Sequence, residues 1–109
     1  MEITLSSHED LPLLRVTGDV DMGTSSRFDA ALKEHSGDFG GSLVIDLSEC
    51  AFMDSGALNV LLQAVRRLDG QAWLGVVGAN RNLRRVFDIE ALTADPRFRL
   101  LDVLPQAGG

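Results

Sequence analysis

The chain alternates twice between a short apolar run and an amphipathic helical segment, and this alternation limits the folds open to it. Residues 42–47 and 72–77 are continuous apolar runs, typical of strands buried on both faces. Between them an apolar stripe recurs at helical spacing, on Leu58, Leu61, Leu62, Val65 and Leu68. A further helix, which Asn80 can cap, carries Leu83, Val86 and Phe87 and precedes a last short strand at 98–103. Two successive strand–helix–strand units predict parallel pairing with right-handed crossovers.

The first third of the chain predicts a hairpin and one more helix. Residues 2–5 alternate polar and apolar, residues 13–17 form a second run, and the polar turn 6–10 between them indicates an antiparallel hairpin. From Thr24, apolar residues recur at helical spacing as far as Gly37. The predicted order is β-β-α-β-α-β-α-β, an α/β fold with a mixed sheet. Residues 1–109 form one domain, with a tail at 104–109.

Composition excludes several classes of protein. With 109 residues, 45% hydrophobic, the chain has the size of one domain and too much apolar content for disorder. The single Cys50 cannot form an internal disulfide, and no Cys/His cluster could hold a structural zinc ion. We find no secretory signal and no run near the ~20 apolar residues of a membrane span, so we expect a cytoplasmic protein without membrane contact.

The net charge of −6 is unevenly divided along the chain. Residues 1–54 carry eleven acidic and three basic side chains, net −8, whereas residues 55–109 carry five and seven, net +2. A nucleic-acid partner would require a contiguous basic surface, which this balance argues against. The acidic half ends at Asp54.

Ser55 is the main candidate for a functional residue, because it follows Asp54 at the point where a strand and turn lead into an amphipathic helix. From spacing alone the favoured interpretation is a helix cap, worth ~1 kcal/mol. A catalytic nucleophile would need a nearby base, and the only histidines, His8 and His35, belong to other segments; a Gly-x-Ser-x-Gly motif is absent. The remaining interpretation is a phosphorylation target, on which a phosphate would add ~−1.5 to −2 charges.

Three segments follow one another along the chain: residues 14–21 (LRVTGDVD) followed by Thr24, residues 44–48 (VIDLS) with 52–55 (FMDS), and residues 83–89 (LRRVFDI) with Leu92. In this order they resemble the STAS family, and within it the bacterial anti-sigma factor antagonists, or anti-anti-sigma factors. The resemblance covers nearly the whole chain. It implies a STAS-like domain with three or four helices packed mainly on one face of the mixed sheet.

The resemblance also implies a function for Ser55. In this family the Ser after Asp is phosphorylated by the anti-sigma factor, a serine kinase of the histidine-kinase-like ATPase type, and a Ser/Thr phosphatase restores the hydroxyl. The unphosphorylated antagonist binds the kinase and frees a sigma factor, thereby regulating transcription. ATP belongs to the partner, so we expect no cofactor, no metal and no enzymatic activity in this chain.

The chain departs from the family pattern just after Ser55. Gly56 stands where Ser or Thr is common, Ala57 where Gly is common, and Asn59 where a small residue is common. Because Gly is a poor interior helix residue, the helix could begin one residue later. The small side chains at 56 and 57 leave room for a close partner.

The sequence therefore leaves two candidate functions from different classes, and an enzyme is the third and least favoured candidate. The first is the phosphorylation switch; the second is a non-switching STAS subunit docked on another assembly, such as a lipid-transport ATPase or a stress-signalling complex. For the first, the expected partner surface comprises Asp21, Met22, Thr24, Asp54, Ser55, Gly56 and Asn59. The larger aromatic residues are expected in the core: Phe28, Phe52, Trp73, Phe87 and Phe98. The sequence leaves the oligomeric state open.

Overall fold

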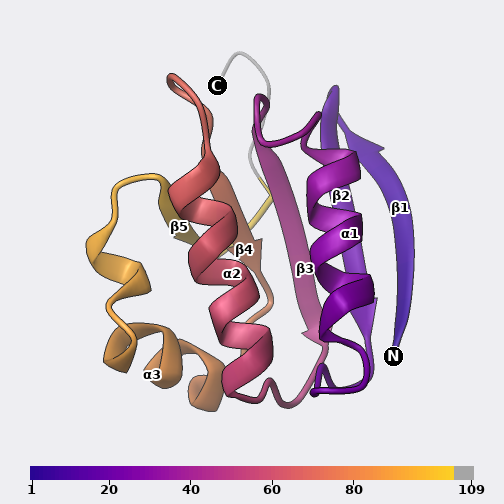
Figure 1. Cartoon of the computed structure of the whole chain (residues 1–109), viewed down its shortest axis with the longest axis vertical. Helices are drawn as coiled ribbons and strands as arrows, with labels where there is room; N and C mark the ends of the chain where they lie inside the picture. Colours follow the sequence, from indigo (N-terminus) through magenta and orange to yellow (C-terminus); the bar gives the residue numbers. More distant parts are fainter. Residues whose placement is uncertain (105–109) are drawn as a thin grey trace.

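The computed structural model describes residues 1–104 and contains a five-stranded mixed sheet with strand order β1-β2-β3-β4-β5 (Figure 1). β1 pairs antiparallel with β2, and all other neighbouring strands are parallel. The predicted element order and the mixed sheet are thus confirmed. The strands are β1 (Glu2–His8), β2 (Leu11–Thr17), β3 (Leu43–Glu49), β4 (Leu74–Val77) and β5 (Phe98–Leu101).

The hairpin between β1 and β2 is tighter than the sequence predicts. The expected turn at 6–10 is wrong, because Ser6, Ser7 and His8 continue β1 and pair with β2. Only Glu9 and Asp10 form the turn, both at positive φ, 50° and 71°. This is the two-residue hairpin connection whose backbone twist suits antiparallel strands.

Within residues 1–104, three α-helices and one turn of 3-10 helix complete the fold. They are α1 (Ser25–His35), α2 (Ser55–Arg67), α3 (Arg81–Ile89) and η1 (Leu92–Ala94). In Figure 1 the helices lie on one face of the sheet, as the resemblance implies. The main core lies between the two layers, where Phe28, Phe87 and Phe98 are buried as predicted.

The other face of the sheet has a smaller apolar cluster. Leu13, Val44 and Val77 are buried there, and Trp73 is only half-buried against them, with the Arg99 guanidinium carbon 4.5 Å from its ring centroid. Trp73 was expected in the core, but it is only partly buried at the margin of this smaller cluster, because alternation along the chain directs it away from the helices.

None of the helices within residues 1–104 is both long and apolar enough to span a membrane. The predicted tail at 104–109 falls, apart from Leu104, outside the described residues.

Candidate functional site

Three loops meet at the edge of the sheet where the parallel strands β2, β3 and β4 end (Figure 1). The loop after β2 and the turn after β3 are hydrogen-bonded to each other. The Val20 amide donates to the Phe52 carbonyl (3.1 Å), and the Asp54 amide donates back to the Val20 carbonyl (3.1 Å). These bonds align residues 19–21 with residues 52–54, next to the start of α2.

The third loop, after β4, is fixed to the same turn. The Nδ2 of Asn80 donates to the Ala51 carbonyl (3.1 Å), while its Oδ1 accepts from the Leu83 amide (2.8 Å) and caps α3 as predicted. Gly78 makes this approach possible. It has φ +75°, and a Cβ there would lie 2.8 Å from both the backbone nitrogen and the Cβ of Ser48. A residue with a side chain would push the loop away from β3.

Asp54, rather than Ser55, caps α2. The Oδ1 of Asp54 accepts from the Ala57 amide (2.9 Å), and Ser55 is the first helical residue. The capping interpretation of Ser55 is therefore wrong, and so is the expectation that Gly56 delays the helix. Ser55 is exposed, and no hydrogen bond engages its side chain within residues 1–104. Its hydroxyl is therefore available to another molecule.

Asp21 and Thr24 organise the loop before α1. The Asp21 Oδ1 accepts from the Gly23 amide (2.9 Å) and from the Thr24 hydroxyl (3.2 Å), and the Asp21 amide donates to Thr24 Oγ1 (3.0 Å). The start of α1 lies close to the start of α2. A Cβ added to Gly56 would lie 4.0 Å from the Oγ of Ser25, the first residue of α1, and 3.3 Å from Asp54 Oδ1. Two helix N-termini, each with partial positive charge, thus flank Ser55.

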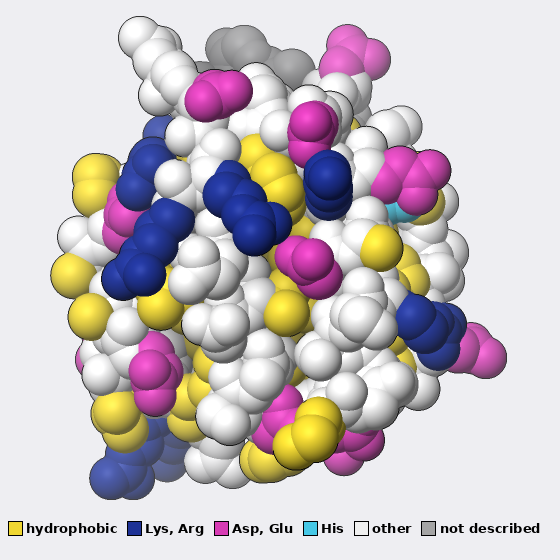
Figure 2. All heavy atoms as spheres, in the orientation of Figure 1, with side chains coloured by type: hydrophobic (Ala, Val, Ile, Leu, Met, Phe, Trp, Pro, Cys, Tyr) yellow, Lys and Arg dark blue, Asp and Glu magenta, His cyan; other side chains and the backbone are white. Residues whose placement is uncertain are grey.

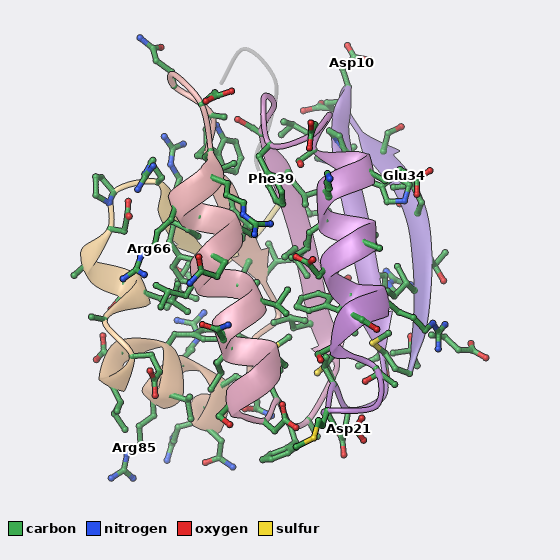
Figure 3. All side chains as sticks on the ribbon, viewed as in Figure 1. Asp10, Asp21, Glu34, Phe39, Arg66 and Arg85 are labelled. Carbon is green, nitrogen blue, oxygen red and sulfur yellow. The ribbon has the colours of Figure 1, made fainter. Side chains whose placement is uncertain are left out.

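The structure brings most of the predicted partner-contact residues to this edge. Figure 3 shows Asp21 at the end of the molecule where α2 begins, far from Asp10. Thr24, Asp54 and Gly56 are placed there by the contacts above, whereas exposed Asn59 lies one turn further along α2. Their role in partner binding remains a prediction.

Phe52 is a surface residue at this edge that the sequence interpretation missed. It was expected in the core but is 54% exposed, and Met22 in the adjoining loop is 86% exposed. Figure 2 shows apolar side chains beside acidic ones at the same end of the helical face. The signal that could have identified Phe52 is its position: it lies in a turn, after the last strand residue and two residues before the helix cap.

Other groups that could do chemistry lie elsewhere or are shielded. His8 ends β1 and His35 ends α1, and His35 lines a hollow with Asp10 at the opposite edge of the sheet. Burial raises the pKa of the Cys50 thiol, and the charge of Asp19 raises it further. Within residues 1–104 no group of three or more His, Cys, Asp or Glu residues could hold a metal ion.

Similarity to known proteins extends over nearly the whole chain. Residues 3–101 match the family profile described as "Mlab, STAS domain". The anti-sigma-F factor antagonist RsfB of Mycobacterium tuberculosis is 30% identical over 105 residues, covering 96% of this chain and 84% of RsfB.

Two solved structures show the same fold. An anti-sigma factor antagonist from Mycobacterium paratuberculosis has a TM-score of 0.80 at 27% identity, covering 94% of this chain and 86% of the other. The antagonist SpoIIAA in its unphosphorylated form has a TM-score of 0.72 at 16% identity, covering 94% and 90%. The chain therefore belongs to the STAS-domain family, among the bacterial anti-sigma factor antagonists.

Proposed function

We propose that this protein is a phosphorylation-controlled binding switch whose phosphoacceptor is Ser55. Unphosphorylated, it binds an anti-sigma serine kinase of the histidine-kinase-like ATPase type in the cytoplasm, and a sigma factor is freed. The observation that carries the proposal is the exposed Ser55 hydroxyl at the first position of α2, directly after a cap supplied by Asp54. Because Asp54 does the capping, phosphorylation of Ser55 would leave the helix cap intact.

The phosphoryl transfer uses a nucleotide that the partner holds. The Ser55 oxygen attacks the γ-phosphorus of ATP, a new O–P bond forms, ADP leaves, and a base of the kinase accepts the hydroxyl proton. Water and a Ser/Thr phosphatase later break that O–P bond and release inorganic phosphate. The chain itself contributes the nucleophile and the docking surface.

Local electrostatics favour a switch that alters the surface more than the fold. The Asp54 cap satisfies the Ala57 amide, which leaves the amides of Ser55 and Gly56 without an intrahelical partner and able to donate to a phosphate. A phosphate adds ~−1.5 to −2 charges next to Asp54 and beside the loop that carries Asp19 and Asp21. These carboxylates repel it, so the edge becomes strongly negative while the helix start tolerates the group.

The surface around Ser55 suits a protein partner. Met22 and Phe52 supply exposed apolar area from two loops that are hydrogen-bonded together. Gly56 adds no side-chain bulk, and Asn59 presents an amide one turn along the helix. A partner that covers this edge excludes water from Phe52. A phosphate on Ser55, in the middle of the contact, displaces that partner by its charge and bulk.

The test is intact mass spectrometry of the purified chain after incubation with each histidine-kinase-like anti-sigma factor of its own organism and Mg-ATP. We expect one added phosphate, mapped to Ser55, and its absence in Ser55→Ala. Ser25→Ala is the matched control, because Ser25 begins the neighbouring helix, and it should still be phosphorylated. Ser55→Ala should bind the kinase persistently and Ser55→Asp weakly. Modification at Thr24, Ser25 or Ser26 instead would refute the assignment to Ser55.

A second candidate is a STAS subunit that docks on another assembly, such as a lipid-transport ATPase, without switching. It is favoured by the description of the matched family profile as Mlab rather than as an antagonist. Affinity purification from the native cell separates the two. Recovery of a transport ATPase, with binding unchanged in Ser55→Asp, would favour the second candidate, whereas recovery of an anti-sigma kinase favours the switch.

A further inference from the structure

Strand β1 is an unusually open edge of the sheet. It pairs with β2 over seven consecutive residues without a bulge, and within residues 1–104 no strand pairs with its other side. Five of its seven residues are exposed, including Leu5 at 49%. It contains no Pro, Lys or Arg, the residues that commonly block pairing at a sheet edge. The other edge strand, β5, has only four residues.

We propose that β1 pairs antiparallel with β1 of a second copy, so that two sheets join into one of ten strands. Side chains point to alternate faces, so a symmetric pairing must bring together residues of the same parity. Centring the pairing on Leu5 engages all seven residues. Leu5 then meets Leu5 of the other copy on the helical face, and Glu2 of each copy lies opposite His8 of the other. This register therefore matches an acid with an imidazole at both ends and apolar with apolar at its centre.

Helix α1 presents a second self-complementary row to the same interface. Asp29 lies on the α2 side, because its carboxylate is 4.0 Å from Arg67 of that helix. At about 100° per residue, Arg27, Ala31 and Glu34 occupy the opposite side of α1, towards β1. Figure 3 shows Glu34 on that side. Within residues 1–104, neither Arg27 nor Glu34 forms an ion pair, and both are exposed.

Pairing of the strands would bring these rows face to face. The two-fold axis is perpendicular to the sheet, so both α1 helices lie on the same face and run antiparallel, with Arg27 of each opposite Glu34 of the other. Helix α1 lies in front of β2 in Figure 1. The two β2 strands would be three strand spacings, about 14 Å, apart. The two α1 helices, each in front of its β2, would then lie farther apart than the about 8–10 Å of directly packed helices. The space between them has room for two Leu5 side chains below and for the long Arg27 and Glu34 side chains between.

The dimer leaves free the end of the sheet where β2, β3 and β4 end and Ser55 lies. Because the axis reverses the strand direction, the two Ser55 sites would point to opposite ends of the ten-stranded sheet. Each copy could then bind its own partner. The inference is independent of the proposed function, since it uses no residue of the Ser55 edge.

Sedimentation velocity of the full chain, over a wide concentration range, tests the inference. We expect a concentration-dependent dimer that Leu5→Lys weakens by about tenfold or more, since two ammonium groups would meet at the axis. Ile89→Lys is the matched control, because Ile89 is 70% exposed on α3 and should leave the dimer intact. Arg27→Glu and Glu34→Arg should each weaken the dimer, and the double variant should restore it.

Three outcomes would overturn the inference. One is a chain that stays monomeric at every concentration. Another is a dimer that Leu5→Lys leaves intact, and the third is a dimer that Ile89→Lys weakens as much as Leu5→Lys does. Far-ultraviolet circular dichroism of each variant confirms that it is folded. Ser55→Ala should dimerise like the wild type whatever its effect on the kinase, so failure of the dimer and failure of the switch are distinguishable.

Discussion

The backbone amide of Asp54 donates to the carbonyl of Val20, 3.1 Å away, although the two residues belong to different strand–helix connections. The same pair of loops is bridged by the bond from Val20 to Phe52. Through these bonds the residue that caps α2 is held by the loop that leads into α1. The position of Ser55 therefore depends on two helices and two strands rather than on the local turn alone.

Asp54→Ala should lower the free energy of unfolding by about 1 kcal/mol, because the Ala57 amide loses its acceptor at the helix start. Asp54→Asn keeps an oxygen that can accept this bond and should retain most of the stability while removing a negative charge. Urea denaturation of the two variants measures the difference. Equal losses in both would show that the charge of Asp54, and not the cap, stabilises α2.

The elements with strong periodic patterns could be predicted from the sequence, and the weakly patterned ones could not. Helix α2 and strand β3 have clear apolar signatures because one face of the helix and both faces of the strand are buried. The end of β1 is polar because most of this edge strand is exposed, so residues 6–8 resembled a turn. The alternation of elements predicted parallel pairing, but not which loops would touch.

The candidate site shows the same division. Ser55 and Asp54 were identified because a helix start has a local signature. Which of them caps the helix depends on backbone geometry, and the exposure of Phe52 depends on which neighbours cover it. The contact between Asn80 and Ala51 joins residues 29 positions apart, so it appears only once β3 and β4 lie side by side.

Asn80 should show two separable effects, because its side chain makes one bond within α3 and one to the turn before α2. Asn80→Asp keeps the acceptor for the Leu83 amide but replaces the donor to Ala51 with a carboxylate oxygen, which should cost about 1 kcal/mol. Asn80→Ala loses both bonds and should cost about 2 kcal/mol. Hydrogen exchange of the amides at 51–54 should accelerate in both variants. Unchanged exchange in Asn80→Asp would show that the contact does not hold the turn.

Truncation should destabilise the fold strongly at Phe28 and only slightly at Phe52. Phe28 is fully buried, so Phe28→Ala should lower the free energy of unfolding by about 3–5 kcal/mol. Phe52 is 54% exposed, so Phe52→Ala should cost less than about 1 kcal/mol. If the proposed partner surface is correct, Phe52→Ala should weaken kinase binding by about tenfold, measured by calorimetry on the folded variant. Full affinity in Phe52→Ala would exclude this side chain from the contact.

Asp46 should make the stability of the fold depend on pH in the acid range. Burial raises the pKa of its carboxyl, but hydrogen bonds from Ser48 and the nearby Arg15 guanidinium outweigh that effect, so the folded-state pKa is lowered. The Ser48 amide is 2.9 Å from Oδ1, and the Arg15 Nε is 3.3 Å from Oδ2.

A lowered folded-state pKa means that ionised Asp46 stabilises the fold above the unfolded-state value of about 3.9. That contribution is lost as the pH falls through the folded-state pKa. Asp46→Asn should therefore reduce the fall in the free energy of unfolding as the pH is lowered, which is the acid limb of the stability curve. Urea denaturation from neutral pH to about pH 3 measures this dependence. Arg15→Met should also reduce this pH dependence, because without its cationic neighbour the folded-state pKa of Asp46 moves back towards the unfolded-state value. Identical acid limbs in wild type and Asp46→Asn would show that other carboxylates govern the acid unfolding.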